Sequence, residues 1–182
     1  MVKDPKKVKA GKKAKTKGAN FERTLVKNFQ DWWCKTYPDA QFARTPRSGG
    51  SELADGWSLA GDIACNDPKF PFHIEAKNQE AWDLEQVVQQ KGIVLDQWWK
   101  QCTKESKKSY IPLLVFTRNY KPTFFMTLNT STLESIFTSL EKSPISMIIL
   151  TAQKKRPCLV IGLLDDLFNT APEQWIISSS DN

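Results

Sequence analysis

The chain has 182 residues, 40% of them hydrophobic, which is the length and composition of a single globular domain. A domain of this length buries about two-thirds of the surface that its unfolded chain exposes, so it can fold without disulfide bonds or a structural metal. The net charge is +6 and the only histidine is His73, which excludes sites that combine a catalytic histidine with histidine metal ligands.

Cysteine spacing and hydropathy predict where the protein works. The four cysteines lie far apart in the sequence and form no close pair of the kind found in zinc knuckles or redox motifs. No apolar run reaches the roughly 20 residues that a membrane-spanning helix needs. We therefore expect reduced thiols, no membrane contact and a cytoplasmic location, in a host cell if the gene belongs to a phage.

The excess positive charge is concentrated at the N-terminus. Residues 1–17 contain eight lysines and one acid, and the rest of the chain has 18 basic and 19 acidic residues. Because residues 1–17 have no apolar face, we expect a disordered tail. Two interpretations stay open: a solubilising or localisation-like tail, or an arm that binds DNA phosphates through residues such as Lys15 and Lys17.

The remaining pattern, residues 18–182, predicts one α/β domain. Phe21, Leu25, Phe29 and Trp32 recur at helical spacing and predict a helix over residues 18–35, with Asn20 as its N-cap. The other expected elements are strands over 41–45, 61–66 and 71–77, two helices within 83–106 that break near Gly92, strands over 111–117 and 121–128, a helix over 130–140, and strands over 146–151 and 158–163. This order predicts a mixed β-sheet flanked by helices.

Three charged residues on the second and third strands form the pattern of most chemical interest. Glu75 and Lys77 alternate with Ile74 and Ala76, so each pair shares one face of its strand. If residues 67–70 form a hairpin turn, Asp62 lies directly opposite Glu75 on the same face. Such carboxylates repel each other unless a divalent cation lies between them. The alternative is an ordinary hairpin with a solvated, charged outer face.

Asp62 and the run Glu75-Ala76-Lys77 resemble the signature of the PD-(D/E)XK nuclease superfamily. The resemblance implies that Asp62, Glu75 and the Ala76 carbonyl bind Mg²⁺, for which Mn²⁺ substitutes. It implies that Lys77 positions and polarises the attacking water. The stretch 17–22 resembles the opening helix of the family, whose glutamate, here Glu22, completes the metal site.

Other stretches extend this resemblance. Residues 44–50 resemble the Arg-x-Pro-x-Ser-Gly stretch of archaeal-type Holliday junction resolvases, and residues 98–102 and 111–116 resemble phage-type members. Gly61 stands where many members have proline. The resemblance implies a restriction-endonuclease-like fold, branched DNA as substrate and a homodimer that presents two active sites.

The same comparison suggests which residues contact DNA. The residues that we expect at the DNA are Lys15, Lys17, Arg44, Arg47, Ser48, Gly49 and Gln101. Glu52 and Asp55, in the loop before Asp62, are further acids that could join the site. We interpret His73 as peripheral and the pair Trp98 and Trp99 as core residues.

The leading hypothesis is a Mg²⁺-dependent endonuclease that selects branched DNA, as in recombination or DNA repair. A second is a restriction-like or general repair nuclease that cuts linear duplexes. A third is a DNA-binding protein without catalytic activity, in which the charged triad is accidental.

Overall fold

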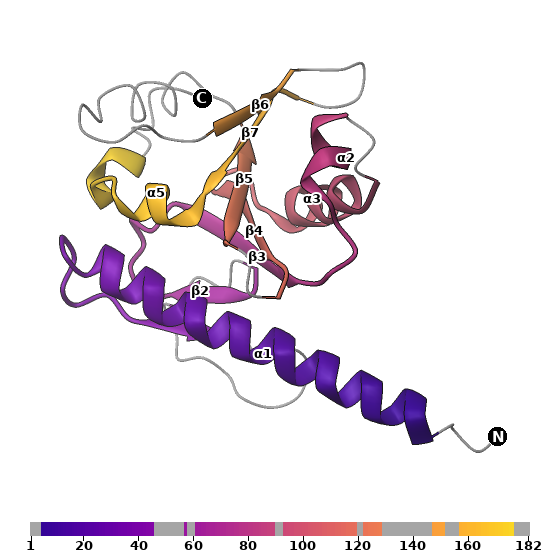
Figure 1. Ribbon diagram of the computed structural model, residues 1–182. Helices are drawn as coiled ribbons and strands as arrows, with labels where there is room; N and C mark the ends of the chain where they lie inside the picture. The colour runs from indigo at the N-terminus through magenta and orange to yellow at the C-terminus, as the bar shows by residue number, and fades with distance from the viewer. Residues whose placement is uncertain are drawn as a thin grey trace.

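The computed structural model describes residues 5–45, 57, 61–89, 93–119, 122–128, 147–151 and 157–176. Within these residues the chain forms a mixed five-stranded sheet with helices on both faces, next to a two-stranded sheet (Figure 1). The predicted α/β class, a mixed sheet flanked by helices, is confirmed. The predicted helix over residues 130–140 lies outside the described residues, and so does the loop predicted over 46–57 except for Trp57.

Helix α1 (Pro5–Trp33) is the longest element and runs beneath the sheet in Figure 1. The prediction of a helix from residue 18 is confirmed, but the helix begins at Pro5, so the expectation of a disordered tail over residues 1–17 is corrected from residue 5 onward. Lysine and alanine, which fill this segment, are good helix formers. They extend a helix whose nucleus is already stabilised by the packed residues that follow.

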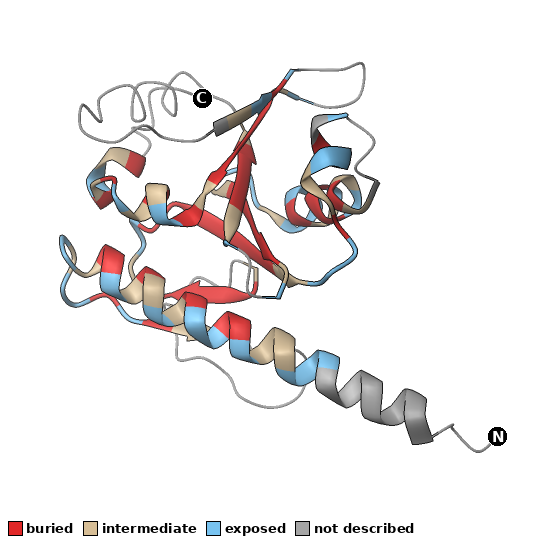
Figure 2. Cartoon of the chain, in the orientation of Figure 1, coloured by how far each residue is buried: buried red, intermediate tan, exposed pale blue. Residues whose placement is uncertain are grey.

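The packed part of α1 carries the apolar stripe that the sequence predicts. Phe21, Leu25, Phe29 and Trp32 are all buried, whereas the opposite face is exposed (Figure 2). The predicted N-cap role of Asn20 is wrong, because Asn20 lies inside the helix, where its Oδ1 accepts a hydrogen bond from Arg23. Among the described residues, no helix combines the length and the apolar character that crossing a membrane requires.

The five-stranded sheet has the order β3-β4-β5-β7-β6. Its strands are β3 (Phe72–Asn78), β4 (Ile111–Thr117), β5 (Phe124–Leu128), β6 (Met147–Leu150) and β7 (Leu159–Leu163). Strands β3 and β4 are parallel and are joined through α2 (Leu84–Val88) and α3 (Ile93–Glu105), as a parallel crossover requires. All other neighbours are antiparallel, and these strands and helices match the predicted ones within a few residues.

The predicted hairpin between residues 61–66 and 71–77 is wrong. Strand β2 (Ile63–Cys65) pairs antiparallel with β1 (Phe42–Arg44) in the separate two-stranded sheet. Its approach to β3 is a parallel bridge between Gly61 and Ile74, so Asp62 is not the ladder partner of Glu75. Because this bridge is parallel, the two segments run in the same direction and cannot form an antiparallel hairpin; β2 takes β1 as its antiparallel partner instead.

Two hydrophobic clusters pack on the two faces of the sheet. The first contains α1 side chains together with Phe72, Ile74 and Ala76 of β3. The second lies under α2 and α3, and includes Trp98 and Trp99, which confirms their interpretation as core residues. The predicted alternation of β3 is thus confirmed, since its apolar face meets α1 and its polar face meets α3. The four cysteines are free thiols.

The sequence did not predict the two short helices at the end of the described chain. They hold α1 against the domain through a hydrogen bond with Trp32. Helix α5 (Leu164–Phe168) and the 3-10 helix η1 (Pro172–Trp175) follow β7 directly. Between them, the Thr170 carbonyl accepts a hydrogen bond from Trp32 Nε1 at 2.8 Å, and its hydroxyl accepts one from Trp175 Nε1 at 2.6 Å. Two buried indole N–H groups are thereby satisfied at one residue.

Candidate active site

A glycine positions the first of the predicted acidic residues. Gly61 has φ of +78°, and a Cβ built on it would lie 2.1 Å from the carbonyl oxygen of Ile74. Only glycine permits this close approach of two backbones without strain. The crossing is closed by a hydrogen bond of 2.7 Å from the Asp62 N–H to the same carbonyl, which directs residue 62 toward the middle of β3.

The Asp62 carboxylate is held against the backbone of β3. Asp62 is 5% exposed, and its Oδ2 accepts a hydrogen bond of 2.9 Å from the backbone N–H of Ala76. Ala76 stands between Glu75 and Lys77 in the sequence. The structure therefore brings Asp62 to the strand segment that the sequence predicted, although through a backbone crossing rather than a hairpin.

Glu75 and Lys77 lie on the face of β3 that α3 covers. Glu75 is only 1% exposed, and its Oε1 accepts a short hydrogen bond from the Lys77 ammonium. The same ammonium donates to Oε1 of Gln101 on α3 at 3.1 Å. Gln101, which we expected at the DNA, thus contacts Lys77, and its contact with DNA stays a prediction. Strand and helix together hold the ammonium between a carboxylate and a neutral amide.

Burial and like charge act together on Glu75. Burial is the main cause that raises the pKa of its carboxyl, and the nearby carboxylates of Asp62 and Glu105 raise it further, against the opposing effect of Lys77. Two buried carboxylates at one place are costly unless a cation compensates them. Carboxylate and backbone carbonyl oxygens are the ligands of hard divalent cations, so this donor set fits Mg²⁺ or Mn²⁺.

Glu22 and Arg44 form a partly buried ion pair at the margin of this region. Oε2 of Glu22, a residue 7% exposed, lies 2.7 Å from Arg44 Nε and 2.5 Å from Nη2. The pair borders the site, since the N–H of the next residue, Thr45, donates to the carbonyl oxygen of Asp62 at 3.0 Å. The observed partner of Glu22 is thus Arg44, and the metal role of Glu22 and the phosphate role of Arg44 stay predictions.

The other predicted DNA contacts fall into two groups. Lys15 is exposed on α1, and Lys17 makes an ion pair of 3.2 Å with Glu80, just beyond the end of β3. The candidates that lie outside the described residues are Arg47, Ser48, Gly49, Glu52 and Asp55. The contact of Lys17 with Glu80 places this part of α1 near the same end of the strand.

Sequence reasoning missed Glu105, which lies near the site, and interpreted His73 as peripheral. Glu105 of α3 groups with His73 and Glu75, so that one potential ligand atom from each lies within 4.8 Å of the others. Glu105 follows Gln101 by four residues, the spacing that puts two side chains on one helix face. That spacing was the available signal, but its use required knowing that α3 packs against β3.

Comparison with known proteins identifies the family of the chain. Residues 13–178 match the model of a family described as "Phage putative PDDEXK endonuclease". Searches of curated proteins and of solved structures each returned no match. The family match spans nearly the whole chain, and includes both the β2–β3 crossing and the helix that covers it. The chain therefore belongs to this phage family of PD-(D/E)XK endonucleases, and its mixed sheet with flanking helices is of the restriction-endonuclease-like class.

Proposed function

We propose that the protein is a metal-dependent DNA endonuclease that hydrolyses phosphodiester bonds, with Asp62, Glu75 and Lys77 at its catalytic centre. The observation that carries the proposal is the meeting of two buried carboxylates and one ammonium at the centre of β3. Burying these charges opposes folding. Catalysis is the function for which such a cost is commonly retained.

Each residue has a definite part in this proposal. Asp62, Glu75 and the carbonyl of Ala76 would hold Mg²⁺, with Mn²⁺ as a substitute. The cation supplies a water of lowered pKa and stabilises negative charge in the transition state. Lys77, held between Glu75 and Gln101, would orient the attacking water and offset the charge that develops on the phosphate. Glu22 contributes a further carboxylate if DNA phosphate draws Arg44 away from it.

Branched DNA is the substrate that we propose. The support is the resemblance of residues 44–50 to the resolvase stretch, together with the place of Arg44 next to the Asp62 backbone. A resolvase cuts two strands related by symmetry, so a homodimer is part of the proposal. The alternative substrate is linear duplex DNA, cut with or without sequence preference.

The first test is cleavage with Mg²⁺ by wild type, Asp62→Ala and Lys77→Ala. We expect both variants to cut less than about one-hundredth as fast as wild type while they still bind DNA. Matched controls are Asp31→Ala and Lys107→Ala, which change exposed residues of the same types and should cut normally. Cutting by Asp62→Ala and Lys77→Ala at the wild-type rate would overturn the assignment. DNA binding without cutting by wild type would favour the non-catalytic alternative.

The second test separates the substrates. Wild type is offered a four-way junction, a nicked duplex and linear duplexes of many sequences, all at equal strand concentration. Preferential, paired cuts in the junction support the resolvase-like proposal, and sedimentation of the protein alone and with the junction tests the dimer. Equal or faster cutting of linear duplexes would move the protein to the restriction-like or repair alternative.

A further inference from the structure

His73 is a buried imidazole for which the catalytic proposal has no use. It is 3% exposed, and among the described residues its Nε2 has no hydrogen-bond partner. Buried polar groups nearly always have a partner, and an exception calls for a strain, an ion or a water to explain it. His73 and Glu75 are two positions apart on β3, so both side chains lie on the face that α3 covers.

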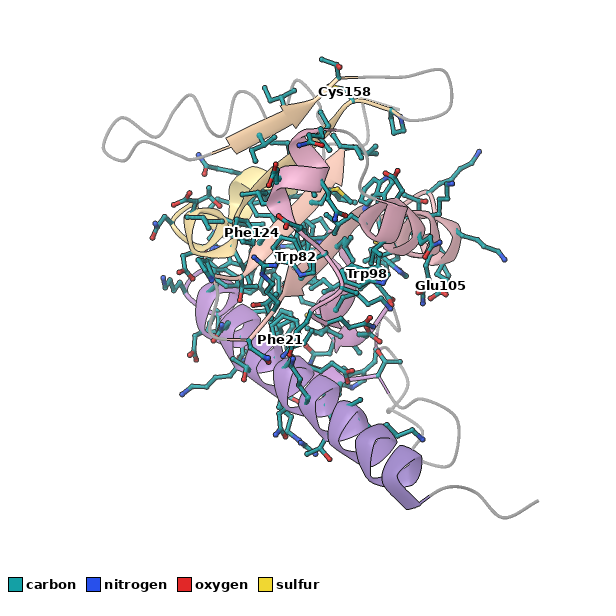
Figure 3. All side chains as sticks on the ribbon, turned by 45° about the vertical axis from the view of Figure 1, so that its right-hand side comes forward. Phe21, Trp82, Trp98, Glu105, Phe124 and Cys158 are labelled. Atoms are coloured by element: carbon teal, nitrogen blue, oxygen red, sulfur yellow. The ribbon has the colours of Figure 1, made fainter. Side chains whose placement is uncertain are left out.

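A third potential ligand approaches these two from the helix. Glu105, labelled in Figure 3, lies at the end of α3, and its carboxylate joins the group in which one ligand atom from each residue lies within 4.8 Å of the others. Bonds of about 2.0–2.2 Å from nitrogen or oxygen to Zn²⁺ require ligand atoms no more than about 4.4 Å apart. Glu105 is exposed, so its side chain can move by the small distance required.

We propose that His73, Glu75 and Glu105 bind a transition-metal dication, with Zn²⁺ as the representative ion. The site shares Glu75 with the proposed catalytic centre but does not use Asp62. An imidazole nitrogen selects Zn²⁺ and related ions, whereas Mg²⁺ prefers oxygen ligands alone. The inference rests on the arrangement of these three side chains, and it stands or falls independently of whether the protein cuts DNA.

The single histidine makes a direct measurement simple. Protein without a histidine tag, labelled with ¹⁵N-histidine, has one imidazole, and its two nitrogen signals belong to His73. Zn²⁺ and Mg²⁺ are titrated into separate samples, because Glu75 is shared with the proposed catalytic centre and excess Mg²⁺ would compete for it. We expect Zn²⁺, but not Mg²⁺ alone, to shift one ring nitrogen to the position typical of a metal-bound imidazole. Ring signals that stay in place with excess Zn²⁺ would overturn the proposal.

Variants then test the other ligands, with Zn²⁺ affinity measured by calorimetry. Glu105→Gln should weaken binding at least about tenfold. Glu85→Gln, the same change at an exposed position on α2, should bind as wild type does. Circular dichroism checks that each variant is folded, and both changes are at exposed positions.

Asp62→Asn separates this proposal from the catalytic one. It should bind Zn²⁺ nearly as wild type does and should fail to cut DNA. Unchanged Zn²⁺ affinity in Glu105→Gln would overturn the site, and so would a loss in Asp62→Asn as large as in Glu105→Gln, because the ion would then lie at the catalytic centre. Continued DNA cutting by Asp62→Asn would count against the proposed function alone.

Discussion

The carboxylate of Asp62 accepts a hydrogen bond of 2.9 Å from the backbone N–H of Ala76, the residue between Glu75 and Lys77. A backbone N–H of β3 thus orients the Asp62 carboxylate in the neighbourhood of Glu75. The hydrogen bond is possible because Gly61 lets the two backbones cross at Ile74. Four predictions follow from this crossing, from the residues beside it and from the charged start of α1.

Gly61→Ala should destabilise the protein by about 2–4 kcal/mol, because it adds a Cβ against a backbone carbonyl at a positive φ. Urea unfolding measures the change. Gly18→Ala is the control, since a Cβ at this helical position has nothing within 4 Å and should stabilise the helix by about 0.5–1 kcal/mol. Equal stabilities for the two variants would show that the crossing at Ile74 is not strained by a side chain.

Gln101→Ala should slow the chemical step roughly tenfold, because the Lys77 ammonium loses its amide partner while Glu75 still holds it. A fall in DNA affinity as well would support the predicted contact of Gln101 with DNA. Single-turnover cleavage and equilibrium binding separate the two effects. Gln97→Ala removes an exposed glutamine from the same helix and should change neither quantity. A matching loss in Gln97→Ala would mean that the effect comes from the helix and not from Lys77.

His73 should titrate below its ordinary pKa of 6.5, since burial lowers the pKa of its imidazole more than Glu105 and Asp62 raise it. As the pH falls below 6.5, the imidazole of His73 is therefore protonated in the unfolded chain before it is protonated in the folded protein. The contribution of His73 to the free energy of unfolding is therefore fully present above pH 6.5. It is lost as the pH falls through and below that value. Imidazole NMR and urea unfolding, both with a chelator present, measure the two quantities.

The variant His73→Gln isolates this contribution. Glu75 acts in the opposite direction, because its raised pKa lets the folded protein take up a proton first as the pH falls. The stability of wild type should therefore decline more steeply than that of His73→Gln between about pH 6.5 and pH 5. An imidazole that titrates at or above 6.5, or equal slopes for both proteins, would contradict the prediction.

The lysines at the start of α1 should make DNA binding depend strongly on salt. Glutamine at positions 6, 7, 9, 12 and 13 removes five charges and keeps a residue that favours helix. The salt dependence of affinity should flatten by about 0.9 log unit per log unit of salt for each lysine that contacts a phosphate. Cleavage at saturating DNA should stay close to wild type. An unaltered slope would show that this segment does not touch DNA.

Periodicity in the sequence predicted the parts of the fold that depend on neighbouring residues. The alternation of Ile74 and Ala76 with Glu75 and Lys77 assigned the two faces of β3, and both faces are as expected. The apolar spacing of α1 predicted its buried stripe. Side-chain direction repeats every two residues in a strand and every 3.6 residues in a helix. This repeat depends only on neighbouring residues, so it can be recognised in the sequence.

The choice of partners depended on contacts between distant segments. The order of residues allowed a hairpin that paired Asp62 with Glu75, but the assembled sheet pairs β3 with β4 and β2 with β1. The polar and apolar alternation cannot distinguish these pairings, because several strands offer equally apolar partners. The tertiary structure decided between them, and Gly61 made the resulting crossing possible.

By itself, the sequence determined that Asp62, Glu75 and Lys77 are candidates for one site, through a short pattern that resembles a nuclease signature. Only the tertiary structure brought Glu105 and Gln101 of α3 to that site and paired Glu22 with Arg44. These contacts link residues between 22 and 32 positions apart. Such pairings depend on how helices pack on the sheet, and packing is a property of the whole folded core rather than of any one segment.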